Sequence, residues 1–235
     1  MKIFIAATFT IQLISGNIIA VFENFQNSSK KTSYRNFDNN VFNNNQVASI
    51  FGDYGCWCHF QSNNGYVGNG FGGPVDEMDE LCKKLHDQYS CIKNDNEFCD
   101  PWTVNYNLPN FNAGFNGVSE ADVVNECGNF NSGDDCAKNA CIVESSFFRI
   151  YFQSGIQLNR FFEHDVFDAS SQCNLGNGFS SWSVSRGEKQ CCGSYPNRSI
   201  NYDGGKGCCA GEVVYSLSLK QCCGDGVVKG VVENC

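Results

Sequence analysis

A histidine followed by an aspartate, His86-Asp87, lies four residues after Cys82 and downstream of a glycine-dense stretch, residues 65–74. Histidine has an unperturbed pKa near neutrality, so His86 can take a proton from water at physiological pH. The neighbouring carboxylate suits calcium, which prefers oxygen ligands and accepts backbone carbonyls as well as side chains. Glycines adopt backbone angles that let such carbonyls turn toward an ion. This combination predicts hydrolysis assisted by calcium.

The dipeptide alone does not predict a site, because His164-Asp165 is a second His-Asp pair. His164 follows Phe161-Phe162-Glu163 and has neither the upstream cysteine nor the glycine-rich loop. We therefore interpret His86 as functional and His164 as a surface residue.

The spacing of apolar residues predicts an amphipathic helix over residues 75–89 that carries His86. Pro74 precedes this helix, and acidic side chains fill its first turns, where they favour the helix dipole. Cys82 and His86 lie one turn apart on the same face. A disulfide at Cys82 would therefore hold the histidine's helix rigidly near its partner.

A second helical pattern runs over residues 134–151, and Ser132, Asp134 and Asp135 are its plausible caps. Ser119 with Asp122 predicts a shorter helix over Val123 and Val124. Asparagine, glycine and two prolines favour irregular structure or a small hairpin over residues 92–117.

The first twenty residues, Met1 to Ala20, predict a secretory signal, because Lys2 precedes an apolar run. No later stretch approaches the roughly 18 apolar residues that a membrane span needs. Residues 21–48 are rich in asparagine and are interpreted as a linker or pro-segment. Asn27-Ser28-Ser29 and Asn197-Arg198-Ser199 are glycosylation acceptor sequences if the chain is exported.

The formal net charge of −9 becomes −10 without Lys2, which argues against nucleic acid as a partner. An acidic surface also favours apolar and aromatic groups for any lipid contact. Trp57, Phe60, Tyr66 and Phe71 are candidates for such contact, and core packing is the alternative for each.

The 16 cysteines indicate an oxidising compartment and fall into two groups of eight, residues 56–141 and 173–235. Each group can close on itself, as two independently stapled units require, although the connectivity cannot be read from the sequence. In the second group, three Cys-Cys pairs form a short repeat, and adjacent cysteines point to opposite faces of an extended chain. Alternation over residues 213–220 predicts a strand. We expect a small disulfide-stapled β unit rather than a metal-binding tail.

Residues 50–152 resemble the secreted phospholipase A2 family, whose helix carries C-C-x-x-H-D after a glycine-rich loop. The match comprises Tyr54-Gly55-Cys56-Trp57-Cys58, then Gly70, Gly72, Pro74, Asp76, Asp79, Cys82, His86 and Asp87. The family also places an aspartate six residues before a helix cysteine, as in Asp135 and Cys141. The paired-cysteine tail resembles galaxin-type repeats of extracellular matrix proteins.

The resemblance implies a mainly α, disulfide-rich fold with two antiparallel helices and a calcium loop. His86 would deprotonate a water that attacks the sn-2 ester of a glycerophospholipid, and Asp135, or alternatively Asp134, would orient the imidazole. Asp87 and loop carbonyls would hold calcium. Trp57 is the best-aligned carbonyl, and Gly68, Gly70 or Asn69 are candidates for the others.

This sequence departs from the family pattern in its longer loop, in His59, and in lacking the second cysteine of the helix pair. One bridge is nevertheless expected, Cys82 to Cys141, joining the two helices.

The resemblance therefore implies a secreted, calcium-dependent phospholipase A2, a lipid-degrading hydrolase and glycoprotein that acts at a phospholipid membrane surface or micelle. The alternative is a non-catalytic, phospholipase-like protein of the extracellular matrix or of lipid surfaces, and the tail could contact matrix components. The predicted parts are a signal peptide (1–20), an Asn-rich segment (21–48), a phospholipase-like domain (49–170) and a Cys-rich repeat domain (171–235).

Overall fold

The structure is a computed structural model of the chain. It describes residues 54–61, 66–67, 70–109, 111, 115, 117–163, 166–175, 190–201 and 205–235. Five predictions lie outside these residues: the signal peptide, the Asn-rich segment with its glycosylation sequence, Gly68, Asn69 and the pair His164-Asp165.

Helix α3 (Glu77–Asp95) is the predicted helix that carries His86. Asp76 caps its start, because its side chain accepts a hydrogen bond from the N–H of Asp79 at 2.9 Å. The helix extends past Tyr89 to Asp95, so the irregular segment begins later than the sequence predicted.

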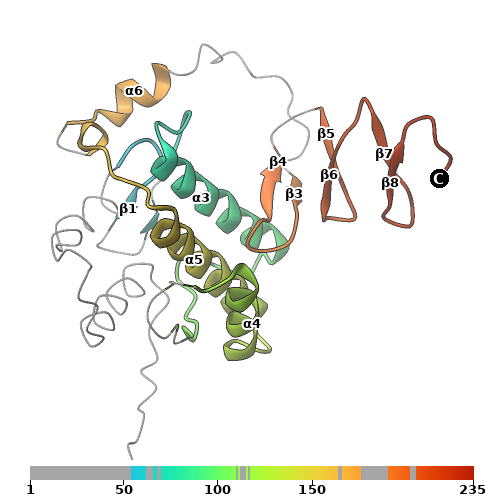
Figure 1. The fold of residues 1–235 in the computed structure, drawn as a ribbon, viewed down its shortest axis with the longest axis horizontal. Helices are drawn as coiled ribbons and strands as arrows, with labels where there is room; N and C mark the ends of the chain where they lie inside the picture. The colour runs from blue at the N-terminus through green and yellow to red at the C-terminus, as the bar shows by residue number, and fades with distance from the viewer. Residues whose placement is uncertain are drawn as a thin grey trace, which may run out of the picture.

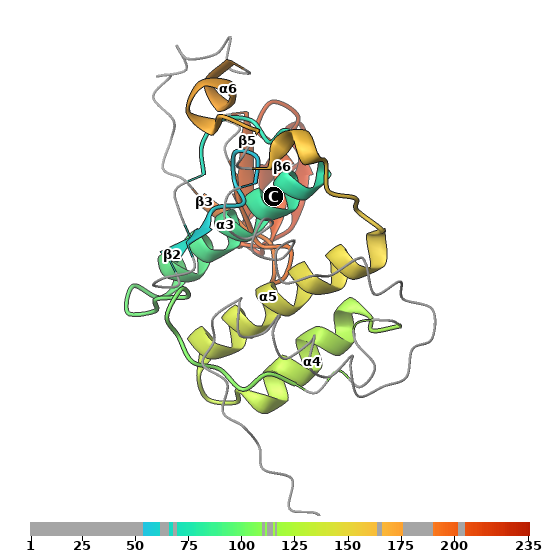
Figure 2. The ribbon, with the colours of Figure 1, turned by 90° about the vertical axis from the view of Figure 1, so that its left-hand side faces the viewer.

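Helix α5 (Asp135–Ser154) is the second predicted helix; Asp134 is its N-cap, and Gly155 ends it in the left-handed conformation. It runs antiparallel to α3, because residues at the end of α3 line one groove with residues at the start of α5. Near the middle of both helices, Tyr89 donates a hydrogen bond to Glu144. Figure 2 shows the two helices side by side, with α4 beyond α5.

Helix α4 (Glu120–Phe130) confirms the shorter predicted helix and begins with a reciprocal capping box between Ser119 and Asp122. It packs on α5, to which the disulfide Cys127–Cys141 joins it. The buried faces of the three helices and the segments between them form one hydrophobic core.

After α5 the chain returns to the start of the described residues through a 3-10 turn, η1 (Arg160–Phe162), and α6 (Ala169–Leu175). The N–H of Gly55 donates to the carbonyl of Phe162 at 2.9 Å, and Cys56 is bonded to Cys173. The predicted domain boundary between residues 170 and 171 therefore falls inside α6.

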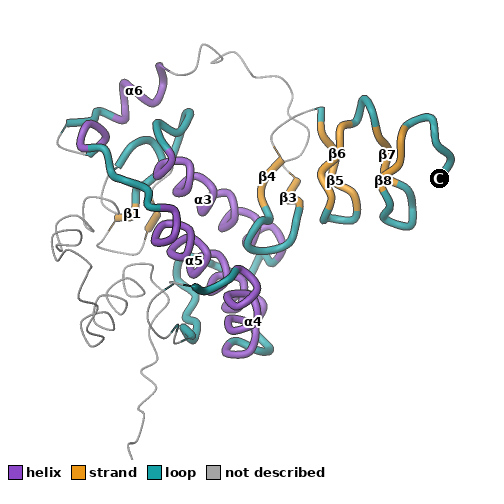
Figure 3. The backbone as a smooth tube through the Cα atoms, viewed as in Figure 1, coloured by secondary structure: helices purple, strands orange, loops and turns teal. Residues whose placement is uncertain are grey.

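The remaining elements are short antiparallel hairpins (Figures 1 and 3). One, β1 (Phe60–Gln61) with β2 (Tyr66–Val67), follows the first turn of the described chain. The tail contains β3 (Gln190–Cys192) with β4 (Ser199–Asn201), β5 (Lys206–Cys209) with β6 (Val213–Ser216), and β7 (Lys220–Cys222) with β8 (Val228–Gly230). The strand predicted over residues 213–220 is shorter, because a turn after Ser216 separates β6 from β7.

All 16 cysteines form disulfides, eight in number, which confirms a disulfide-rich fold. The expectation that each group of eight closes on itself is wrong. Cys56–Cys173 and Cys91–Cys191 join the two groups. In the tail, the second cysteine of each pair bonds forward along the chain, in Cys192–Cys208, Cys209–Cys222 and Cys223–Cys235.

The predicted bridge between Cys82 and Cys141 is also wrong. Cys82 is bonded to Cys58, and Cys141 is bonded to Cys127 in α4. The antiparallel packing explains the difference, because Glu144 on α5 already lies opposite Tyr89 on α3. A residue that precedes Glu144 therefore lies nearer to the end of α3 than to Cys82.

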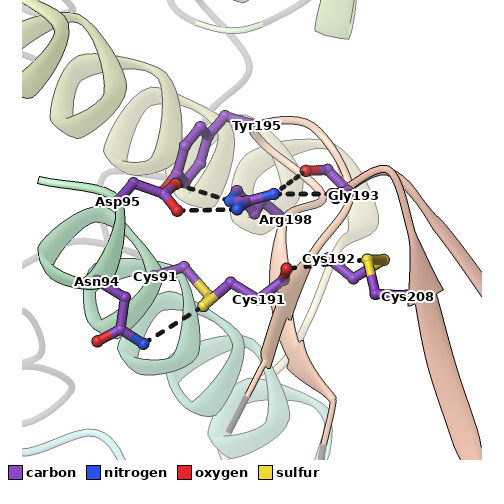
Figure 4. Close-up of a disulfide and its surroundings, with 10 residues drawn as sticks. Cys91, Asn94, Asp95, Cys191, Cys192, Gly193, Tyr195, Arg198 and Cys208 are labelled. Atoms are coloured by element: carbon purple, nitrogen blue, oxygen red, sulfur yellow. Dashed lines mark hydrogen bonds and ion pairs between the residues drawn. A yellow bond between two sulfur atoms is a disulfide. The ribbon is translucent and has the colours of Figure 1, made fainter. Parts of the chain in front are cut away.

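The β3–β4 hairpin lies against α3, as Figure 4 shows, and is bonded to it through Cys91–Cys191. Arg198 donates to both carboxylate oxygens of Asp95, at 2.7 and 2.8 Å, and the Tyr195 hydroxyl donates to the same group at 2.9 Å. This two-point contact between a guanidinium and a carboxylate fixes the orientation of the hairpin.

The second glycosylation sequence lies in the turn of this hairpin. The Asn197 side-chain oxygen accepts from Lys84 at 3.0 Å, and its amide donates to Glu120 at 2.8 Å. Asn197 thus links the hairpin to both α3 and α4.

Within the described part of the chain, none of the helices has the length and apolar character that crossing a membrane requires.

The disulfide between α3 and the hairpin closes a sequence separation of 100 residues, whereas the last one, Cys223–Cys235, closes 12. Long loops restrict the unfolded chain more than short loops. Replacing both Cys91 and Cys191 by serine should therefore lower the free energy of unfolding by about 2–5 kcal/mol. Urea unfolding monitored by tryptophan fluorescence measures this loss.

The matched control replaces both Cys223 and Cys235 by serine, and its loss should be smaller. Equal losses in the two double variants would show that the hairpin's attachment to α3 does not support the helical core.

Candidate functional site

The site is built from the turn at residues 54–58 and from α3. The carboxylate of Asp79, in the first turn of α3, accepts hydrogen bonds from three backbone N–H groups: those of Cys56 at 3.0 Å, Trp57 at 2.7 Å and Val75 at 2.9 Å. Asp79 is fully buried, and this burial raises its pKa, while the three backbone hydrogen bonds act in the opposite direction. The turn is therefore held against the start of α3 by a carboxylate.

The disulfide Cys58–Cys82 makes a second attachment between the turn and α3. Cys82 lies one helical turn before His86, so this bond holds the turn close to the histidine. The sequence predicted that a disulfide at Cys82 would position His86, and the structure identifies Cys58 as the partner.

His86 packs against Trp57. Its Nε2 atom is 2.9 Å from the Trp57 carbonyl oxygen, and its ring meets the indole ring edge-on with centroids 5.6 Å apart. Because a carbonyl oxygen can only accept a hydrogen bond, this contact requires the proton on Nε2. Nδ1 is then the basic nitrogen of the neutral ring.

The surroundings of His86 favour the neutral imidazole. Only 8% of the residue is exposed, and a second ring, that of Trp102, lies 5.7 Å away. Burial lowers the pKa of His86 to about 4, although the Trp57 carbonyl and the charge of Asp87 act in the opposite direction. At neutral pH, His86 is therefore unprotonated, as a general base must be.

Asp87, the predicted calcium ligand, forms an ion pair with Lys83, one turn earlier on α3. The distance from the Lys83 Nζ to the Asp87 carboxylate is 3.0 Å, and the ammonium also lies 5.4 Å from the centroid of a Trp57 ring. The Lys83 ammonium and the His86 imidazole thus border the same indole.

Trp57 and Gly70, two of the predicted carbonyl ligands, contact each other. A Cβ on Gly70 would lie 2.4 Å from the Trp57 ring, so only glycine allows this packing. The indole N–H donates to the Gly72 carbonyl at 3.2 Å. The glycine-rich segment therefore wraps the tryptophan, and the predicted ligand Gly68 lies outside the described residues.

The donor atoms fit calcium in type, because a carboxylate and a peptide carbonyl are both hard oxygen ligands. Both already have partners, Lys83 on Asp87 and His86 on Trp57. Across the residues that the structure describes, no three His, Cys, Asp or Glu side chains gather in a ready metal-binding group. An ion at Asp87 would therefore need further oxygens, from loop carbonyls or water.

Asp135, the predicted partner of His86, requires correction. Its carboxylate forms an ion pair with Lys138 and its side chain is 81% exposed. Together with Ile92 and Asp95 it lines a groove at the far end of α3, and Ile92 alone is about 9 Å along the helix from His86. The alternative, Asp134, caps α5 by accepting from the N–H of Ala137 at 3.0 Å.

The carboxylate that faces the middle of α3 is Glu144, which sequence reasoning missed. It is fully buried and accepts hydrogen bonds from the hydroxyls of Tyr89 and Tyr106. The Trp102 ring lies against both Tyr89, at 4.2 Å between centroids, and His86. A glutamate in the apolar run Ile142-Val143-Glu144 was the available signal, since a buried charge needs partners.

Burial raises the pKa of Glu144 to about 7, although the two tyrosine hydroxyls act to lower it. Burial thus shifts the pKa of both groups, upward for Glu144 and downward for His86. Perturbed pairs of this kind are typical of functional sites.

No protein-family model matches this chain, and its sequence matches no curated protein.

The depressed pKa of His86 predicts a loss of stability in acid. The unfolded chain protonates this histidine near pH 6.5 and the folded chain only near 4, so the unfolded state binds more protons between these values. The wild type should lose about 2–3 kcal/mol more than His86→Gln as the pH falls from 7 to 4. Urea unfolding of both proteins at several pH values measures the difference, and parallel curves would contradict it.

The raised pKa of Glu144 predicts the opposite slope. Its carboxyl is protonated in the folded protein up to about pH 7 but ionises near 4.5 when unfolded, so its stabilising contribution is lost as the pH rises through this range. Glu144→Gln should match the wild type at pH 4.5 and exceed its free energy of unfolding at pH 8 by about 2 kcal/mol. A variant less stable than the wild type at pH 8 would show that the tyrosines stabilise the ionised form.

Proposed function

We propose that this chain is an exported phospholipase A2, which hydrolyses the sn-2 ester of glycerophospholipids with calcium as its cofactor. The supporting observation is the contact between His86 Nε2 and the Trp57 carbonyl at 2.9 Å, beside Asp87 on the same helix. This contact joins a neutral base to a loop carbonyl, and the carboxylate follows the base directly on the helix. These three groups are the ones that this chemistry needs.

In this mechanism the Trp57 carbonyl fixes the imidazole tautomer, so Nδ1 is the basic nitrogen of the neutral His86 ring. Nδ1 takes a proton from the water as the water oxygen attacks the ester carbonyl carbon. The imidazolium can then return that proton to the departing alkoxide, which restores the neutral ring. The Trp57 carbonyl thus takes the orienting role that the family resemblance implied for Asp135 or Asp134.

Asp87 and the carbonyls of Trp57 and Gly70 are the described groups that would hold calcium. When bound, calcium polarises the ester carbonyl and stabilises the negative charge that develops on its oxygen. A carbonyl oxygen has two lone pairs, so Trp57 can keep its contact with His86 while it contacts an ion.

Export is supported by the eight disulfides, which persist in oxidising compartments. Lipid contact is supported by two exposed aromatic side chains, Phe71 and Phe161. The N–H of Phe71 donates to Cys56 of the turn at residues 54–58, and Phe162, next to Phe161, accepts from Gly55 of the same turn. Trp57 is only partly exposed, because it packs against His86, and the side chains of Phe60 and Tyr66 lie outside the described residues. The partner we propose is a phospholipid membrane surface or micelle.

One observation favours the alternative, a non-catalytic lipid-binding or matrix protein. Lys83 already neutralises Asp87, and a module without catalysis could keep this ion pair permanently. The chain of cysteine-paired hairpins would then serve as its contact with matrix components.

Hydrolysis of phosphatidylcholine vesicles, in calcium or in chelator, tests the proposal. Loss of a general base lowers rates by about 10²–10⁴-fold, so His86→Gln should lose at least about 100-fold in turnover. Chelator should abolish turnover by the wild type. The control Lys93→Gln alters an exposed side chain at the end of the same helix and should retain full activity.

Activity that survives His86→Gln would refute the mechanism, and activity that ignores chelation would remove calcium from it. Absence of turnover together with tight calcium binding would support the non-catalytic alternative.

A further inference from the structure

Lys83 and Asp87 form a partly buried ion pair at the carboxylate that we propose as a metal ligand. The two residues are four apart on α3, the spacing at which side chains meet on a helix surface. Their nitrogen–oxygen distance is 3.0 Å, and the side chains are 24% and 9% exposed. The ammonium therefore neutralises a carboxylate that has little access to water.

A second contact keeps the ammonium at this place. The Lys83 Nζ lies 5.4 Å from the centroid of a Trp57 ring, within the range of attraction between a cation and an aromatic face. The ring cannot turn away easily, because its N–H is bound to Gly72 and Gly70 packs against it. Lys83 is thus held between a fixed aromatic ring and a buried carboxylate.

Lys83 is hydrogen-bonded to one oxygen of the Asp87 carboxylate, and a divalent cation at that oxygen would occupy the same space as the ammonium. Two positive charges within a few ångströms repel each other, most strongly where water is scarce. Lysine has a flexible four-carbon stem that can carry its charge into solvent, and part of Lys83 is already exposed. Ion binding and the Lys83–Asp87 pair are therefore mutually exclusive arrangements of one site.

We propose that Lys83 is a tethered competitor of divalent cations at Asp87. This inference deepens the proposed function, on whose metal site it rests. In the absence of the ion, Lys83 compensates the buried carboxylate, which alone would be costly. When the ion binds, Lys83 must leave, and the affinity of the site is lowered by the ion pair that is broken. Lys83 thus sets the calcium concentration at which the site fills.

The test measures ion binding rather than turnover. Terbium binds calcium sites and emits when a nearby tryptophan is excited, so Trp57 reports its arrival at Asp87. Lys83→Met keeps the length of the side chain and removes its charge. Its half-saturating terbium concentration, and the calcium concentration that displaces terbium, should fall about tenfold, which corresponds to about 1.4 kcal/mol.

The matched control, Lys93→Met, removes the same charge from the exposed end of α3 and should leave both concentrations unchanged within twofold. Asp87→Asn should abolish the signal, with or without Lys83. In addition, Lys83→Met without calcium should melt at a lower temperature than the wild type, and calcium should restore it.

Equal affinities in the wild type and Lys83→Met would overturn the competition. So would binding of terbium to neither protein, an outcome that would also remove calcium from the proposed function. The vesicle assay with His86→Gln remains an independent test of the catalytic base, so failure of the metal site and failure of the hydrolase are distinguishable.

Discussion

Three backbone N–H groups converge on the buried carboxylate of Asp79, and the geometry of the site depends on this contact. Asp79 lies two helical turns before His86, so the carboxylate sets where the Trp57 carbonyl meets the imidazole. Gly55 makes the close approach possible. Its backbone φ is +60°, and a Cβ there would lie 2.6 Å from the Asp79 carboxyl carbon. The turn therefore requires glycine at one position and a carboxylate at another, and neither residue takes part in the proposed chemistry.

Local spacing predicted most of what lies on single helices. The helix around His86, the shared face of Cys82 and His86, and Asp134 as one of three candidate caps of α5 all follow from short-range periodicity and capping. The role predicted for Asp135 failed because it depends on the register between two antiparallel helices. That register is determined by packing and by the pairing of Glu144 with Tyr89, and no local pattern encodes it. The spacing of Lys83 and Asp87 was visible in the sequence, but the position of the Trp57 ring against the Lys83 ammonium was not.

The positions of the cysteines along the chain did not predict their pairing. The prediction of two separately closed groups required each unit to fold on its own, whereas the β3–β4 hairpin is bonded to α3. Each Cys-Cys pair in the tail sends its first cysteine backward and its second cysteine forward. Cys191 also bonds backward, but its partner, Cys91, lies on helix α3, whereas Cys208 and Cys222 bond to cysteines of the preceding hairpin. The helical core is thus the first member of the series, which Cys223–Cys235 continues.

Neighbouring residues of α3 face two different structures. Lys83 pairs with Asp87 and contacts the Trp57 ring, while Lys84 donates to Asn197 of the hairpin. Similarly, Gln88 donates to the Pro196 carbonyl of the hairpin, while Tyr89 donates to Glu144. Helix α3, which carries the base, is therefore also held by the hairpin. Its hairpin contacts, at Lys84 and Gln88, come from residues next to those that contact the site, Lys83 and Tyr89. A helix fixed from both sides cannot rotate without breaking buried hydrogen bonds, and each such break is costly. The hairpin thus belongs to the frame that keeps His86 in contact with the Trp57 carbonyl.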